Sequence, residues 1–408
     1  MDLIVKNARL SDGDAGVPMD VGVTAGRIVD VAPELDGDAE IVDLGGRLVV
    51  PGFIESHIHL DKACILDRCR SEEGTLAEAI REVAAAKQEF TVADIRQRAV
   101  RVLEKAILQG TTRMRTHLEV DPVIGLKGIE AILPLRREYA WAIDLEVCVF
   151  PQDGMLNNPG TEALMLHALG AGATILGGCP YTDSDPMAQI DRVFELAREY
   201  DTDIDFHLDF DLDPRGMTLG RVCDNAGRFG WGGRVAVGHV SKLSALSPDR
   251  LAMMVTRMAD AGVALTVLPA TDLFLMGGEG HTNVPRGVAP LHVARGHGVT
   301  CALSTNNVLN PFTPFGDCSM IRMANLFANI ARIGTTAGHR DCFDYITGGP
   351  ARLMRLGDYG IRPGNPADFV VLDCCSVESA VREIATPLFG YKNGRRTFTR
   401  PAAELHKP

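Results

Sequence analysis

The chain has 408 residues, of which 46% are hydrophobic and 23% charged, and 41 Lys and Arg against 53 Asp and Glu give a formal net charge of -12. This composition is typical of a soluble globular protein that is long enough for one large domain and a smaller companion. The acidic balance argues against a nucleic-acid partner, and no apolar run approaches the roughly 20 residues of a membrane span, so we expect no membrane partner either.

The cysteines and the N-terminus bear on the compartment. None of the ten cysteines is spaced as Cys-x-x-Cys, the pattern of a zinc knuckle or a redox motif. Residues 1–6 lack the basic segment and long apolar core of a signal peptide. We therefore expect reduced thiols and a cytoplasmic protein.

The first 50 residues read as short strands separated by Gly and Asp turn residues, at 3–5, 21–23, 27–31, 41–43 and 48–50. Such strands need partners, and the far end of the chain supplies candidates at 368–372 and 390–394. We therefore expect a small β-sandwich built from residues 1–50 and 356–408, with residues 51–355 as a catalytic domain between them.

In that central part, apolar runs alternate with helical patterns such as 75–88, 187–199 and 250–261. Thr91 and Asp94 form a plausible capping pair at the start of one helix. Alternation of this kind favours parallel strands with helical crossovers, and eight runs predict a (β/α)8 barrel. The predicted strands are 53–59, 112–120, 144–150, 173–178, 203–208, 234–240, 264–268 and 300–304.

The first predicted barrel strand ends in a metal-binding pattern. Residues 51–62 read Pro-Gly-Phe-Ile-Glu-Ser-His-Ile-His-Leu-Asp-Lys, and alternate residues of a strand share a face, so His57 and His59 point to the same side. Two neutral imidazoles suit zinc or iron. Taken alone, a His-x-His pair more often has one packed and one solvated histidine.

The flanking residues of this segment favour metal binding. With Pro-Gly-Phe-Ile-Glu before the pair and Leu-Asp-Lys after it, the segment resembles the first-strand motif of the amidohydrolase superfamily, above all the branch holding cytosine deaminase and N-isopropylammelide isopropyl amidohydrolase. The resemblance extends over nearly the whole chain. It implies the barrel with a split sandwich, and hydrolysis that depends on a metal ion.

The ends of the other strands supply further candidates, since catalytic groups of such barrels lie at the carboxyl ends of the strands. The resemblance implies that His207 is the third metal ligand and that Gln152 orients a pyrimidine-like ring through the donor and acceptor of its amide. It places His117 near the pocket and gives His239 a polarising or proton-shuttling role. For Asp272, a substrate contact and a structural cap are equally plausible.

Strand eight departs from the family pattern. The superfamily ordinarily has a metal-binding aspartate where this chain has Asn306, and cytosine deaminase has a second aspartate where Asn307 stands. An amide oxygen is a weak ligand and no base near pH 7. Either His239 or His117 deprotonates the water, or the metal alone lowers the pKa of its water far enough, or hydrolysis has been lost. Phe210 replaces a glutamate of cytosine deaminase, so a standard cytosine deaminase is not expected.

Two further residues point to the substrate. Lys62 follows the histidine pair and is expected to bind an anionic group or to pair with an acid such as Glu55 or Asp61. Phe312, with Phe210, suits the wall of a pocket for a flat heterocycle, although buried aromatic residues are more often plain core. No lysine ends the fourth strand to bridge two metals, so we expect one divalent ion.

The sequence thus predicts a metal-dependent hydrolase that acts on a non-peptide C–N bond of a cyclic amide, amidine or amino-substituted nitrogen heterocycle. Two alternatives stay open because of Asn306. One is a non-catalytic protein that binds heterocycles, and the other is a lyase or isomerase on the same scaffold. Barrels of this kind often assemble through their outer helices, which leaves a homo-oligomer open as well.

Overall fold

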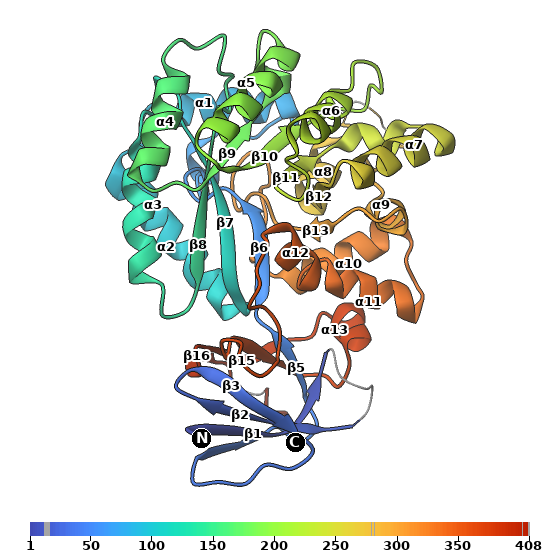
Figure 1. Cartoon of the computed structure of the whole chain (residues 1–408). Helices are drawn as coiled ribbons and strands as arrows, with labels where there is room; N and C mark the ends of the chain where they lie inside the picture. The colour runs from blue at the N-terminus through green and yellow to red at the C-terminus, as the bar shows by residue number, and fades with distance from the viewer. Residues whose placement is uncertain (12–16, 279, 281, 402, 407–408) are drawn as a thin grey trace.

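Two β-sheets, one above the other in Figure 1, organise the chain in the computed structural model, which describes residues 1–11, 17–278, 280, 282–401 and 403–406. The upper sheet is a barrel of eight parallel strands that follow one another in chain order. All eight predicted barrel strands are confirmed. They are β6 (Phe53–Ile58), β7 (Thr111–Glu119), β8 (Asp144–Phe150), β9 (Ile175–Gly178), β10 (Asp203–Leu208), β11 (Val235–His239), β12 (Val263–Val267) and β13 (Cys301–Leu303).

Helices surround the barrel and cover the outer faces of its strands (Figure 1). The helix α2 begins as predicted, because the side chain of Thr91 accepts a hydrogen bond from the backbone N–H of Asp94 at 3.2 Å. None of the described helices is both long and apolar enough to cross a membrane. The helices are α1 (Leu76–Lys87), α2 (Val92–Leu108), α3 (Lys127–Glu138), α4 (Thr161–Ala171), α5 (Pro186–Glu199), α6 (Leu219–Phe229), α7 (Pro248–Asp260), α8 (Pro269–Leu275), α9 (Leu291–Gly296), α10 (Met320–Ala331), α11 (Thr336–Asp344), α12 (Gly348–Leu353) and α13 (Val377–Glu383), with short 3-10 turns at Leu66–Arg68, Pro180–Thr182 and Ser241–Ala245.

The lower sheet joins strands from both termini, as the sequence predicts. The strand β1 belongs to both of its layers, because its first half pairs with β2 and β4 and its last two residues pair with β5. Apolar side chains from both ends of the chain, such as Val21, Val49, Phe369 and Tyr391, form one core between the layers. The strands are β1 (Leu3–Leu10), β2 (Met19–Thr24), β3 (Arg27–Ala32), β4 (Glu40–Asp43), β5 (Leu48–Pro51), β14 (Phe369–Leu372), β15 (Pro387–Lys392) and β16 (Arg395–Thr399).

The barrel closes between β6 and the segment after β13. There the backbone N–H of Asn306 donates to the carbonyl oxygen of His57 at 3.0 Å, and the N–H of His59 donates to the carbonyl oxygen of Asn306 at 2.9 Å. The carboxylate of Glu55 accepts hydrogen bonds from the N–H of Thr305 at 3.1 Å and from its hydroxyl at 2.6 Å. These bonds fix the register of β6 against strand eight, and with it the direction of the two histidines.

The helix α12 packs so closely on β13 that Gly349 has no room for a side chain. A Cβ atom there would overlap the carbonyl oxygen of Cys301 and lie 3.0 Å from that of Asp344. We predict that Gly349→Ala lowers the free energy of unfolding by about 1–3 kcal/mol, since backbone must move. The measurement is the midpoint of thermal unfolding.

Gly227 provides the matched control, because it also lies in a helix but is exposed, and no atom lies within 4 Å of the position that a Cβ atom would take there. Gly227→Ala should raise the free energy of unfolding by up to about 1 kcal/mol through helix propensity. A Gly349→Ala protein that unfolds at the wild-type temperature would contradict the close packing of α12.

Candidate functional site

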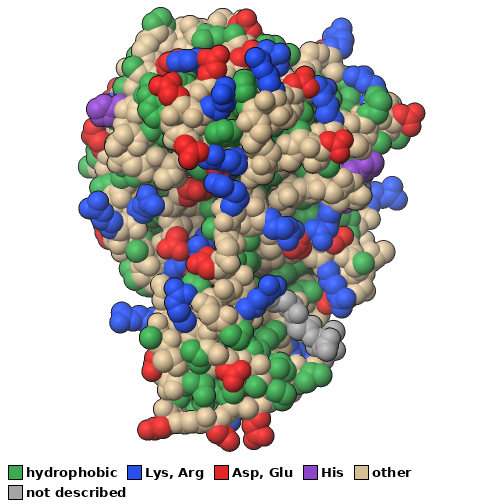
Figure 2. All heavy atoms as spheres, viewed as in Figure 1, with side chains coloured by type: hydrophobic (Ala, Val, Ile, Leu, Met, Phe, Trp, Pro, Cys, Tyr) green, Lys and Arg blue, Asp and Glu red, His purple; other side chains and the backbone are tan. Residues whose placement is uncertain are grey.

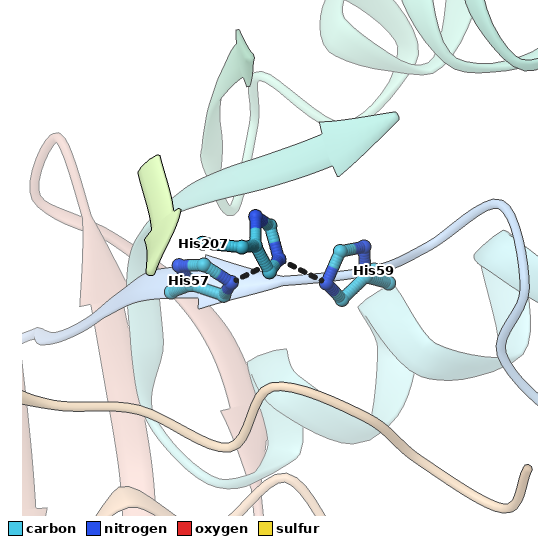
Figure 3. Close-up of side chains that lie close together, drawn as sticks. All are labelled: His57, His59 and His207. Atoms are coloured by element: carbon cyan, nitrogen blue, oxygen red, sulfur yellow. Dashed lines mark hydrogen bonds between the residues drawn. The ribbon is translucent and has the colours of Figure 1, made fainter. Parts of the chain in front are cut away.

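Three histidine side chains converge at the carboxyl ends of β6 and β10. The Nε2 atom of His207 lies 3.0 Å from Nε2 of His57 and 3.0 Å from Nε2 of His59, and Figure 3 shows the three rings close together. Imidazole nitrogens bound to one tetrahedral zinc at about 2.0–2.1 Å lie about 3.3 Å apart. The three nitrogen atoms are therefore spaced to share a single metal ion.

The same three histidines are neutral. Burial, followed by the neighbouring charged and imidazole groups, lowers the pKa of His57, His59 and His207 well below the ordinary histidine value. The other ring nitrogen of His59, Nδ1, lies 3.2 Å from the carbonyl oxygen of His117, which leaves Nε2 as the nitrogen with the lone pair. Neutral imidazoles with converging lone pairs are what a zinc or iron ion requires.

Asn306 stands beside these histidines. Its backbone joins it to His57 and His59 through the two hydrogen bonds that close the barrel. Its amide nitrogen donates to the hydroxyl of Thr271 at 3.1 Å, whereas its amide oxygen is buried without a hydrogen-bond partner among the described residues. A buried acceptor without a partner is costly, so this oxygen is a fitting additional ligand or water anchor.

A buried carboxylate lies behind His57. Asp205 on β10 is 3.8 Å from Nδ1 of His57 and 3.5 Å from Nε2 of His117, whose ring stacks on that of His57 with centroids 3.8 Å apart. Arg115 donates to Asp205 at 2.9 Å. Although burial opposes ionisation, His117 and Arg115 hold the pKa of Asp205 below its ordinary value, so this carboxylate is charged.

His239 at the end of β11 has a carboxylate partner of its own. Its Nδ1 atom lies 2.6 Å from Oδ1 of Asp272, which is fully buried. The second oxygen of Asp272 accepts from the backbone N–H of Leu268 at 3.3 Å, so this residue also caps α8. Burial raises the pKa of Asp272, while His239 opposes the rise. The ring of Phe210 lies 3.9 Å from that of His239 and gives this side an apolar neighbour.

Lys62 pairs with a carboxylate that was not predicted from the sequence. Its Nζ atom donates to Oε1 of Glu119 at 2.6 Å and to Oε1 of Gln152 at 2.8 Å, and it lies 4.9 Å from the centre of the Phe312 ring. The expected pairing with Glu55 or Asp61 is wrong. The carboxylate of Glu55 is directed at Thr305 across the barrel closure, and burial raises the pKa of Glu55 to about 7.

Asn307 has a structural partner. Its amide oxygen accepts from the amide nitrogen of Asn310 at 2.7 Å, and that nitrogen also donates to the carbonyl oxygen of Lys62 at 3.1 Å. The loop after β13 is thus tied to the loop after β6. Asn307 and Phe312 both lie in this loop and are buried, with exposed fractions of 3% and 7%.

The carboxylates of Asp205 and Glu119 were not predicted from the sequence. Asp205 could have been found, because it lies two residues before His207 and shares its face of the strand. Glu119 lies two residues after His117 and in the same way shares its face of β7. A third residue near the site, Lys87, could not have been singled out from the sequence, because it ends an ordinary helical pattern as the last residue of α1.

The family follows from a comparison with known proteins. The amidohydrolase family matches residues 40–132 and 129–398, which is most of the chain, and the protein belongs to this family. It is therefore an enzyme of the amidohydrolase and deaminase type, a hydrolase of C–N bonds other than peptide bonds.

Several relatives are similar over most of their length. The N-isopropylammelide isopropyl amidohydrolase of Pseudomonas sp. (strain ADP) is 28% identical over 404 residues, which cover 97% of this chain and 96% of that protein. The pterin deaminase of Rhizobium rhizogenes (strain K84 / ATCC BAA-868) is 29% identical over 361 residues, covering 86% of this chain and 81% of that one. The crystal structure of 5-methylcytosine deaminase from Klebsiella pneumoniae, liganded with 5-fluorocytosine, superposes with a TM-score of 0.94 over 99% of both chains, at 27% identity.

The buried pair of Arg115 and Asp205 gives a stability prediction. Arg115→Met leaves the fully buried carboxylate of Asp205 without its cation, and we expect a loss of about 3–5 kcal/mol in the free energy of unfolding. Arg192→Met is the matched control, because the pair of Arg192 with Glu162 is about one-third exposed, and its loss should cost below about 1 kcal/mol. Denaturant titration measures both, and equal losses would contradict the assignment.

Proposed function

We propose that this enzyme hydrolyses a C–N bond of a cyclic amide, amidine or amino-substituted nitrogen heterocycle, with one divalent metal ion held by His57, His59 and His207. The observation that carries the proposal is the convergence of their three Nε2 atoms. Three relatives are named for reactions on N-isopropylammelide, pterin and 5-methylcytosine, which supports a ring substrate. When bound, zinc or iron supplies Lewis-acid activation of water.

The proton transfers fall to His239 and Asp272. Asn306 is neutral at ordinary pH and accepts no proton, so its role is to hold the attacking water or to add a weak ligand through its unpartnered oxygen. Asp272 engages Nδ1 of His239 at 2.6 Å, which leaves Nε2 of the same ring to take the proton from the water and return it to the leaving nitrogen. His117 suits this task less well, because it is packed beneath His57.

Lys62, Gln152 and Phe312 form the recognition side of the site. Lys62 and Gln152 bring polar hydrogens to the substrate ring, and Phe312 offers an apolar face beside the ammonium of Lys62. Asn307 supports this side through Asn310. Phe210 stands at the position where cytosine deaminase has a glutamate, so the proposed substrate differs from cytosine. The partner is then a small molecule, with no nucleic acid and no membrane, in the cytoplasm.

Metal content tests the ligand set. We expect about one zinc or iron per chain in the wild-type protein, because three neutral nitrogens converge on one point, and loss of that metal in His207→Ala. The control is His167→Ala, an exposed histidine on α4 whose change should leave the metal in place. Elemental analysis and turnover of a panel of cyclic amides and amino-heterocycles give the two readouts.

Two results would contradict this ligand set and its use. If His207→Ala kept both its metal and its activity, the assignment of His207 would be wrong. If the wild-type protein held no metal and Asn306→Asp gained metal and turnover, the barrel would be a non-catalytic binding protein. A substrate panel followed by product mass separates hydrolysis, which adds the elements of water, from isomerisation, which adds nothing.

The His239 and Asp272 pair gives a kinetic prediction. Asp272→Asn keeps the shape of the side chain but removes the negative charge that supports the imidazolium, so kcat should fall about 100-fold or more. Metal content should stay at the wild-type level, since the hydrogen bonds of the Asp272 carboxylate go to His239 and Leu268 and not to the three metal-binding histidines. A variant with wild-type kcat would show that another group moves the proton.

A further inference from the structure

Lys87 is a buried cation beside the recognition side of the site. It is the last residue of α1, which follows β6 and precedes α2 in the chain and lies near the top of Figure 1. Figure 2 shows lysine and arginine side chains spread over the viewed face of the molecule, whereas the side chain of Lys87 is only 3% exposed. Its Nζ atom lies 2.7 Å from Asp121, 3.3 Å from Glu119 and in contact with Asp153.

These contacts connect Lys87 with Lys62 and Gln152, the two residues proposed to recognise the substrate. One oxygen of Glu119 faces Lys87, and the other accepts from Lys62 at 2.6 Å. Asp153 is the neighbour of Gln152 in the chain, so Lys87 holds the loop that carries Gln152 as well. Lys87 therefore fixes the position of Lys62 through Glu119 and that of Gln152 through Asp153.

Lys87 supplies one of the two positive charges in this region. Three carboxylates, from Glu119, Asp121 and Asp153, face two ammonium groups, from Lys62 and Lys87. Although burial opposes ionisation, the two lysines hold the pKa of Glu119 below its ordinary value. Without Lys87, the single cation of Lys62 would be drawn toward three carboxylates, and its position beside the substrate would no longer be determined.

The hydrogen-bond inventory shows what this arrangement offers to a ligand. An ammonium has donors only, so the amide oxygen of Gln152 must face Lys62, and this bond uses up the acceptor of Gln152. The amide nitrogen lies 3.6 Å from the sulfur of Cys179, which is a weak acceptor. The hydrogens that remain on Lys62 and Gln152 are all donors, so the pair is matched by a ring that presents acceptors.

We propose that Lys87 is a positioning residue that holds Lys62 and Gln152 as a donor-only pair, and that the site thereby selects heterocycles whose recognised edge carries oxo groups over those that carry amino groups. The inference rests on the proposed function, because it concerns which rings the same site accepts. Lys87 itself contacts carboxylates on the protein and acts on the ligand through them.

Uracil and 2,4-diaminopyrimidine are the two probes, because they carry oxo and amino groups, respectively, at the same ring positions. Their ring nitrogens differ as well, since both carry hydrogens in uracil and lone pairs in 2,4-diaminopyrimidine, so the comparison reads the exocyclic groups and the ring nitrogens together. Calorimetric titration into the purified protein measures binding whether or not a ring is turned over. We expect the wild-type protein to bind uracil about tenfold or more tightly than 2,4-diaminopyrimidine. The amino groups of 2,4-diaminopyrimidine would place hydrogen-bond donors opposite the donors of Lys62 and Gln152. In Lys87→Met this preference should fall to about threefold or less.

Lys392 offers a control of the same chemistry at the other end of the barrel. It is also a buried lysine between carboxylates, with Nζ 2.6 Å from Asp144 and 2.6 Å from Asp368. Lys392→Met should lose stability in the same way and keep the wild-type preference for uracil. A general loosening of the fold would instead lower the preference in both variants, which would overturn the inference.

A second variant, Asp153→Asn, tests the inference if Lys87→Met does not fold. Asp153→Asn removes one contact of Lys87 at a side chain that is 32% exposed, and its preference should lie between those of wild type and Lys87→Met. An unchanged preference in both variants that fold, or no preference for uracil in the wild type, overturns the inference. Turnover of other rings by that same wild-type protein would leave the proposed hydrolase function standing, whereas preference without any turnover would contradict the proposed function alone.

Discussion

The bonds that close the barrel also build the proposed metal site. Asn306 exchanges two backbone hydrogen bonds with His57 and His59, so the residue that completes strand eight is held between two of the three histidines. Glu55 and Ser56 lock the same junction through Thr305 and Ser304. Because side chains alternate along a strand, a slip of one residue here would turn both histidines out of the pocket. The fold and the chemistry thus depend on one short stretch of main chain.

Around that stretch, the carboxylates lie one layer behind the groups that face the proposed ligand. Asp205 lies behind His57, Asp272 behind His239, and Glu119 behind Lys62. Each carboxylate orients a ring or an ammonium, while the side chains nearest the proposed metal position are neutral imidazoles and the amide of Asn306. A neutral inner layer leaves the charge of a bound divalent ion largely uncompensated, which favours a metal-activated water over a carboxylate base.

Much of this arrangement was readable from the sequence, for a physical reason. Strand periodicity and turn residues are local signals, and they located all eight barrel strands and the sandwich strands of the N-terminal part. At the other end they located β14, but the predicted stretch 390–394 covers the end of β15 and the turn after it, and β16 was missed. The spacing of His57 and His59 is equally local. The pairing of Lys62 with Glu119 is not a local signal, because the two residues lie 57 positions apart in the chain and meet only through the pairing of β6 with β7. Nearby acids such as Glu55 were the natural guess, yet the carboxylate of Glu55 bonds to Thr305 across the barrel closure.

The amides of strand eight explain how the site keeps this charge pattern. Asn307 and Asn310 bond to each other, and Asn310 also bonds to the carbonyl oxygen of Lys62, so the two loops are joined without a carboxylate. A charged side chain at either position would stand close to Lys62 and compete with Glu119 for its ammonium. With amides there, the charge of Lys62 is matched from β7 alone, and Glu119 in turn is shared with Lys87. The electrostatics of the recognition side are therefore set by β7 and α1, while strand eight contributes shape and hydrogen bonds.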